Sequence, residues 1–185
     1  MTNNEFLARI EHLFTTRGGA LYGGEAVTQL EHGLQAALLA EKAGDDPALI
    51  SAALLHDVGH LLHGHGDDCA EQGIDDNHEE LGVRFIVKHF GPAVTEPVRL
   101  HVQAKRYLCQ ADVGYRAALS PPSQLSLRLQ GGPMTDAEAT EFQANPHFVS
   151  AIALRHYDDE AKVVGMPTPS YIHFAKYLEA SLANS

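Results

Sequence analysis

The chain has 185 residues, of which 44% are hydrophobic, and it carries a formal net charge of −11 at pH 7. This length and composition predict one domain with a substantial hydrophobic core. The negative charge argues against binding to nucleic acid or to an anionic membrane surface, but metal ions or local cations could still favour a small anionic substrate.

No apolar stretch reaches the roughly 18 residues of a membrane span, and the N-terminus lacks the basic and apolar segments of a signal peptide. Cys69 and Cys109 are too few for a disulfide framework and match no zinc-binding spacing. We therefore expect reduced thiols and a cytoplasmic protein with no membrane partner.

Helical periodicity, together with helix start and stop signals, recurs along the chain. The predicted helices cover residues 5–14, 27–43, 47–62, 78–90 and 95–109, a short segment up to Gln130, a segment capped by Thr135 and Glu138, and two final segments that begin near Phe148 and at Thr168-Pro169. Gly44 is expected to end the second helix, and Asp46 to cap the third. Pro97 is expected in the first turn of its helix, where proline is tolerated.

Two stretches read as loops. Residues 21–25 contain Gly23-Gly24, which frees the backbone and predicts a mobile segment, and residues 64–77 are polar. No alternating strand pattern persists and no internal repeat is present. The fold prediction is therefore all-α, a single compact helical bundle.

One motif organises the chain, Leu54-Leu55-His56-Asp57-Val58-Gly59-His60. An apolar run that ends in His-Asp suits a metal site, because imidazole and carboxylate bind Fe, Mn or Zn, and an aspartate can bridge two ions. On a continuous helix His60 would share a face with His56. The simpler alternative is a buried hydrogen bond between His56 and Asp57.

Other candidate ligands favour the metal site over that alternative. They are His32, His78, His101 and either Asp158 or Asp159. Each histidine belongs to a different predicted helix, and helices in a bundle can point such residues towards a common centre. One ion needs only a histidine, the His-Asp pair and a distal aspartate, so two further histidines fit a second ion.

This order of ligands resembles HD-domain proteins, and the second histidine pair resembles their dinuclear branch. Further segments are similar to one subgroup, the HD-domain mixed-valent diiron oxygenases that cleave carbon–phosphorus bonds. These segments are Tyr22-Gly23-Gly24-Glu25, Gln29-Leu30-Glu31-His32, His101 to Lys105-Arg106-Tyr107-Leu108, Gln130-Gly131-Gly132-Pro133-Met134 and Arg155 to Asp158. The resemblance implies one HD domain over residues 1–185, with a metal-binding core at about 22–160.

The resemblance also implies a cofactor and a set of site residues. The cofactor is two iron ions, Fe(II)/Fe(III), with O2 as co-substrate. The implied ligands are His32, His56, Asp57, His78, His101 and Asp158, with Asp57 bridging. Tyr22 would occupy an iron until substrate arrives, and Glu25 would receive the substrate ammonium. The polar set around the phosphonate would be His60, Lys105, Ser123, Ser126 and Arg155, with Gln29 close by.

The implied substrate is a small organophosphonate, of the 1-hydroxy-2-aminoethylphosphonate type or its N-trimethyl analogue. The products would be phosphate and glycine or glycine betaine. Two other functions use the same ligands: an HD-type phosphohydrolase acting on a phosphate ester or nucleotide, and a non-catalytic module that senses a phosphorylated ligand. Individual residues also have simpler interpretations. Lys105 could be solvated, Arg155 could pair with Asp158 or Asp159, and Tyr22 and Glu25 could be surface residues.

Overall fold

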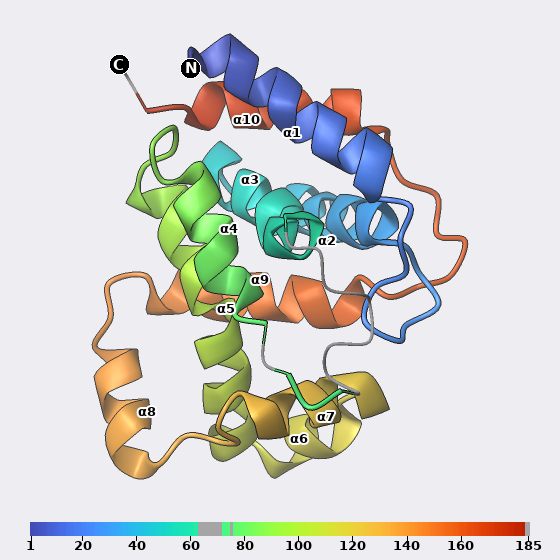
Figure 1. Ribbon diagram of the computed structural model, residues 1–185. Coiled ribbons are helices and arrows are strands. Elements are labelled where there is room, and N and C mark those ends of the chain that lie inside the picture. Colours follow the sequence, from blue (N-terminus) through green and yellow to red (C-terminus); the bar gives the residue numbers. More distant parts are fainter. Residues whose placement is uncertain (63–71, 75, 184–185) are drawn as a thin grey trace.

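The computed structural model describes residues 1–62, 72–74 and 76–183. Within these residues the fold consists of helices and two isolated β-bridges, without a sheet, so the all-α prediction is confirmed (Figure 1). The elements are α1 Asn3–Arg17, α2 Gln29–Ala43, α3 Pro47–Leu55, the 3-10 helix η1 Val58–Leu61, α4 His78–Ile86, α5 Pro92–Ala111, α6 Val113–Ala118, α7 Pro121–Leu129, α8 Asp136–Gln143, α9 Phe148–Glu160 and α10 Tyr171–Ser181. None of these helices is long and apolar enough to cross a membrane.

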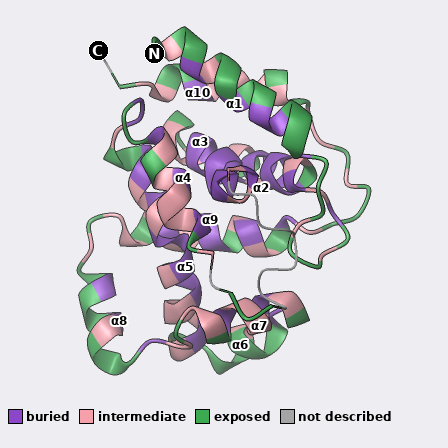
Figure 2. Ribbon diagram, viewed as in Figure 1, coloured by how far each residue is buried: buried purple, intermediate pink, exposed green. Residues whose placement is uncertain are grey.

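The most apolar helix, α3, lies at the centre of the bundle. Its residues Ile50 to Leu55 are all buried, and Figure 2 shows this helix as almost entirely interior. It packs against α2, α5 and α10, while α1 lies beside α10 as an outer layer (Figure 1). Helices α6, α7 and α8 form the opposite end of the molecule. The polar motif that follows α3 is therefore surrounded by other helices.

Several predicted helix ends are confirmed. Asp46 caps α3 by accepting from the Leu49 amide, and Gly44 ends α2 in the left-handed conformation, at φ 81°. Glycine suits this position because it has no Cβ to clash there. Thr135 and Glu138 form the expected capping box. These local signals fix where the helices begin and end, and hence which residues face the centre.

The predicted continuous helix over 47–62 is wrong, because α3 ends at Leu55. Asp57 has φ −104° and ψ 14°, and a single 3-10 turn follows it. The cause is tertiary: a Cβ on Gly59 would lie 1.9 Å from the carbonyl oxygen of His78, so the backbone of η1 lies directly against the start of α4. His56 and His60 therefore do not share a helix face as expected.

Other helix boundaries also differ from the predictions. Helix α5 begins at Pro92, so Pro97 falls inside the helix and beyond its first turn. Helix α4 ends earlier than expected, at Ile86, and α10 begins at Tyr171. The six-residue α6 is too short to show periodicity and was not predicted. The expected loop over 64–77, together with Cys69, falls largely outside the described residues.

Candidate metal centre and substrate pocket

Four buried histidines are each held by a hydrogen bond at Nδ1. His32 Nδ1 lies 2.8 Å from the Ala161 carbonyl, His56 Nδ1 2.8 Å from that of Ala53, and His101 Nδ1 2.7 Å from that of Val98. His78 differs, because its partner is a carboxylate oxygen of Asp76 at 2.9 Å. A partner at Nδ1 fixes the tautomer, so that Nε2 is left to bind a metal.

The free nitrogens of these histidines meet in two pairs. His32 Nε2 lies 3.0 Å from His56 Nε2, and His78 Nε2 lies 3.1 Å from His101 Nε2. If both rings of a pair were neutral, each would present a lone pair at Nε2 and the two would repel at this distance, so each pair has to hold a cation, either a proton or a metal ion. A cation between them converts the repulsion into coordination, since metal–imidazole bonds are about 2.0–2.1 Å long.

Asp57 lies between the two histidine pairs. Its Oδ2 is 3.4 Å from His32 Nε2 and 3.2 Å from His56 Nε2, while its Oδ1 is 3.3 Å from His78 Nε2 and 3.4 Å from His101 Nε2. Both oxygens are buried, and neither has a hydrogen-bond partner among the described residues. A buried carboxylate without partners is costly. This is the geometry of a carboxylate that bridges two cations.

Asp158 completes one side of the cluster. Its Oδ1 lies 3.4 Å from His32 Nε2, whereas the carboxylate of Asp159 turns towards Tyr115 and Arg155. Two groups of possible ligands share Asp57: the first is His32, His56, Asp57 and Asp158, and the second is Asp57, His78 and His101. The second group has one ligand fewer, which leaves more open coordination positions for a substrate or O2. The residues present fit two metal ions.

The acidic and imidazole groups of the cluster strongly affect one another's protonation. Burial alone would lower the pKa of His32, but the carboxylates of Asp158 and Asp57, each 3.4 Å from its Nε2, outweigh it and raise that pKa to about 9. His78 behaves similarly, with the Asp76 hydrogen bond raising its pKa to about 9 against the effect of burial. Burial lowers the pKa of His101 to about 3. Metal binding must therefore displace protons from the metal-free protein.

Tyr22 covers the His32 side of the cluster. Its ring stacks on that of His32 with centroids 3.8 Å apart, and its hydroxyl donates to Asp158 Oδ1 at 3.3 Å. The two glycines that follow Tyr22 have positive φ values, 45° and 83°, which favour glycine and shape this turn. The chain is thereby folded back so that Tyr22 points at the candidate ligands.

Three basic side chains border the cluster. Lys105 is buried and donates to Ser126 Oγ at 3.0 Å, and burial followed by the nearby Arg155 charge lowers its pKa to about 8. Arg155 is buried and pairs with both Asp158, at 2.5 Å, and Asp159. The ion pair considered from the sequence is therefore present with both aspartates. Lys162, which was not predicted, donates to Ser123 Oγ at 3.1 Å.

Helix α7 supplies three serines that contact the two lysines and Glu25. Ser123 and Ser126 hold the two lysines, and Ser120, the N-cap of α7, donates to Glu25 Oε1 at 2.6 Å. Glu25 Oε1 also lies 3.9 Å from Lys162 Nζ. Gln29 is buried in the first turn of α2, with no side-chain hydrogen bond to the cluster among the described contacts. The structure therefore places Glu25 beside Lys162 and the serines of α7.

His60 lies beside the second histidine pair. Its ring stacks on His78 with centroids 4.0 Å apart, and its Nδ1 lies 2.8 Å from Asp76 Oδ2.

Asp76 was not singled out from the sequence, because it lies in a polar stretch with several aspartates. Lys162 was missed because it follows the end of α9, where no periodicity indicates its direction. Tyr115 was missed together with α6.

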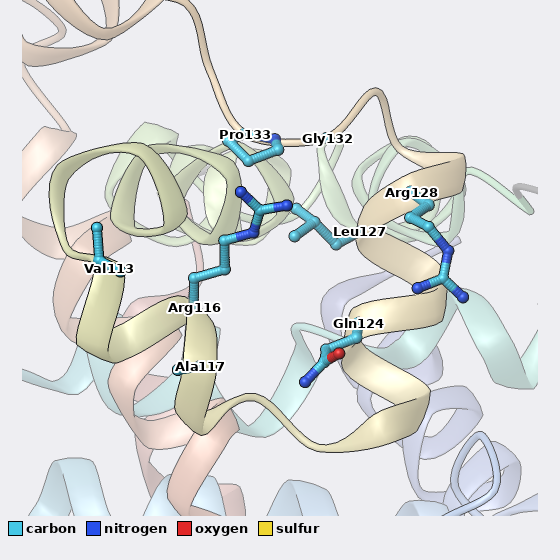
Figure 3. Close-up of a pocket in the computed structure, with 8 residues that line it drawn as sticks. All are labelled: Val113, Arg116, Ala117, Gln124, Leu127, Arg128, Gly132 and Pro133. Atoms are coloured by element: carbon cyan, nitrogen blue, oxygen red, sulfur yellow. The ribbon is translucent and has the colours of Figure 1, made fainter.

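A separate pocket of about 440 Å³ lies between α6, α7 and the turn at Gly132-Pro133 (Figure 3). Arg116 and Arg128 are among its lining residues, and both are exposed. None of the predicted site residues lines it. The candidate metal ligands are instead buried, with the Tyr22 ring stacked on that of His32.

Comparison with known proteins bears on what this cluster does. The family model of the HD domain matches residues 30–139. The chain is 44% identical over 185 residues to the hydroxymethylphosphonate dioxygenase of Gimesia maris, covering 100% of this chain and 92% of the relative. It is 42% identical over 167 residues to the 1-hydroxy-2-(trimethylamino)ethylphosphonate dioxygenase (glycine-betaine-forming) of Leisingera caerulea, covering 90% and 85%. The chain belongs to the HD-domain phosphonate dioxygenases.

A third relative, an uncharacterised protein of Acanthamoeba polyphaga mimivirus, is 38% identical over 157 residues, which is 84% of this chain and 72% of the relative. Membership of the HD-domain phosphonate dioxygenases makes the protein a metal-dependent enzyme that uses O2. It argues against the phosphohydrolase and sensor interpretations, because the two relatives with a named activity are both dioxygenases.

Proposed function

We propose that the protein uses two iron ions and O2 to cleave the carbon–phosphorus bond of a 1-hydroxyphosphonate that carries a cationic nitrogen on the neighbouring carbon. The observation that carries this proposal is Asp57, whose two buried oxygens face different histidine pairs. The proposed ligands are His32, His56, Asp57, His78, His101 and Asp158. When bound, the iron ions would supply Lewis acidity to the substrate oxygens and electrons to O2.

The overall reaction balances with O2 as the only oxidant. It is R–CH(OH)–PO3²⁻ + O2 → R–COO⁻ + HPO4²⁻ + H⁺, in which the C–H and C–P bonds break. One oxygen atom of O2 is needed to complete the carboxylate and the other to complete the phosphate. With an aminomethyl R group the organic product is glycine, and with a (trimethylammonio)methyl R group it is glycine betaine.

The residues around the cluster suit the two ends of this substrate. Lys105 and Lys162 are cations that already donate to Ser126 and Ser123, and a phosphonate dianion can accept hydrogen bonds from all four side chains. Arg155 contributes mainly through Asp158 and Asp159, because both carboxylates bind its guanidinium. His60 borders the second proposed ion through its stacking on His78.

Glu25 is the proposed partner of the substrate nitrogen. Its carboxylate lies next to Ser120 at the start of α7, and it can attract an ammonium or a trimethylammonium group by charge. Tyr22 is proposed to shield the cluster until substrate binds, because its hydroxyl donates to Asp158 and its ring covers His32. Moving Tyr22 away would open coordination positions for the substrate.

A substrate without a nitrogen, hydroxymethylphosphonate, is the second candidate. It is favoured by the 44% identity to the Gimesia maris enzyme, and by Ser120 and Lys162, which already engage Glu25. A substrate with only a hydroxymethyl group would leave those contacts intact.

The test is an oxygen-electrode assay of iron-loaded protein with racemic 2-amino-1-hydroxyethylphosphonate, its N-trimethyl analogue and hydroxymethylphosphonate. Equal amounts of O2 consumed and phosphate released support the oxygenase, and the highest kcat/KM identifies the substrate. Phosphate release from phosphate esters without O2 uptake contradicts the proposal.

A further inference from the structure

Asp76 holds two histidines of the site at once. Its Oδ1 lies 2.9 Å from His78 Nδ1, and its Oδ2 lies 2.8 Å from His60 Nδ1. Its side chain is only 8% exposed, so water screens these contacts poorly. The two imidazole rings stack with centroids 4.0 Å apart and an interplanar angle of 20°. A single carboxylate therefore fixes the orientation of both rings.

This arrangement sets His78 apart from the other three histidines of the cluster. Those three are held by backbone carbonyls: His56 and His101 by the carbonyl three residues earlier in α3 and α5, and His32 by that of Ala161, just after α9. His78 is the first residue of α4, and its N-cap Asn77 adopts a left-handed conformation at φ 48°. As the first residue of α4, His78 has no preceding turn of its own helix to offer a carbonyl to Nδ1. Among the described residues, the Asp76 side chain takes that role.

We propose that Asp76 is a positioning residue for the metal site formed by Asp57, His78 and His101. By accepting the Nδ1 proton of His78, it directs His78 Nε2 towards His101 and Asp57, where the distances are 3.1 and 3.3 Å. A negatively charged acceptor at Nδ1 also makes the ring a more basic ligand than a carbonyl does. By accepting from His60 Nδ1, Asp76 keeps that ring against His78.

A nearby carboxylate allows the hydrogen bond to be separated from charge alone. Glu79 Oε2 lies 3.8 Å from His78 Nδ1, which is too far for a hydrogen bond. Asp76 and Glu79 thus place one negative charge each near the same nitrogen, but only Asp76 is within hydrogen-bonding distance of it. Glu79→Gln is the matched control for Asp76→Ala.

The experiment titrates metal-free protein with Co(II), without substrate or O2, and follows the visible absorption of the bound ion in competition with a chelator. The parent is expected to bind two ions. Asp76→Ala should keep one ion at parental affinity and bind the other about 10–100-fold more weakly, the usual cost of losing such a partner. Asp76→Asn should give a smaller loss, because an amide oxygen can accept from only one of the two rings. Glu79→Gln should bind both ions like the parent.

The inference rests on the two-ion site of the proposed function, and the outcomes separate the two. A parent that binds fewer than two ions overturns the two-ion site and this inference with it. A parent that binds two ions, together with unchanged affinities in both Asp76 variants, overturns only the role of Asp76. An equal loss in Glu79→Gln also overturns it, because charge alone would then explain the effect. Thermal unfolding of the metal-free variants checks the fold, and Asp76→Asn keeps the test decisive if the alanine variant does not fold.

Discussion

The Tyr22 ring lies nearly parallel to that of His32, at an interplanar angle of 14°, while the Tyr22 hydroxyl donates to Asp158. One side chain thus covers two proposed ligands of the same ion. Burial raises the pKa of Tyr22 well above its usual value, and the carboxylates of Asp158 and Asp57 raise it further. In the metal-free protein the hydroxyl is therefore neutral at physiological pH.

Tyr22→Phe should increase O2 consumption in the absence of substrate. Loss of the hydroxyl removes the contact with Asp158, so O2 reaches a reduced iron centre before the phosphonate does. We expect uncoupled O2 uptake to rise severalfold, measured with an oxygen electrode and iron-loaded protein. Tyr107→Phe is the matched control, since the Tyr107 hydroxyl interacts with Gln143 on α8, away from the cluster. Unchanged uncoupled uptake in Tyr22→Phe would contradict the shielding role.

Substrate binding should weaken as the pH rises through about 8. The pKa of Lys105 is lowered to about 8 by burial and by Arg155, so the ammonium is charged below that pH and neutral above it. A bound phosphonate favours the charged form, hence KM should be flat below pH 8 and rise above it. The Lys105→Arg variant keeps its positive charge at all these pH values. Its KM should therefore rise less above pH 8, even if that KM is higher at every pH. An equally steep rise in Lys105→Arg would assign the pH dependence to another group.

Lys162→Met should raise KM by about tenfold or more with a smaller effect on kcat, because the proposed role of this cation is to contact the phosphonate and not the reacting carbon. The exposed Lys176 is the control, and Lys176→Met should leave both constants unchanged.

Comparing substrates adds a second readout of the role of Lys162. If Lys162 offsets the charge of Glu25, its removal should penalise hydroxymethylphosphonate more than a substrate with a cationic nitrogen. Equal kinetics for the parent and Lys162→Met would remove this residue from the phosphonate site.

The ligand spacing could be read from the sequence because it depends on helix order alone. His32, His78 and His101 occupy separate helices, and a bundle that buries those helices brings the three side chains to one place. The features of the site that could not be predicted from the sequence depend on tertiary contacts. The helix break after His56 results from the close approach of Gly59 to His78, in a stretch whose local sequence favours a continuous helix. Lys162 lies outside any helix, so no periodic pattern indicated that it faces the site.

Metal binding at pH 7 should release about two protons per chain. His32 and His78 both have a pKa raised to about 9, so both are protonated in the metal-free protein at pH 7, and both must lose a proton to bind an ion. The apparent affinity for the metal should therefore increase with pH up to about 9 and level off above that pH. Calorimetric titration in buffers of different ionisation enthalpy measures the number of protons released. If no protons were released, neither histidine would lose a proton when the metal binds, and the prediction would be wrong.

Arg155→Met should destabilise the metal-free protein much more than the metal-loaded one. Arg155 and Asp158 are 3% and 1% exposed, and removing one member of a buried ion pair typically costs about 3–5 kcal/mol. A metal ion bound by Asp158 replaces the lost positive charge, so the loss should shrink when the protein is loaded. Urea unfolding with metal or with a chelator measures both values. Arg99→Met, which breaks a half-exposed pair with Glu96, should cost at most about 1 kcal/mol in either state. An equal loss with and without metal would show that no ion neutralises Asp158.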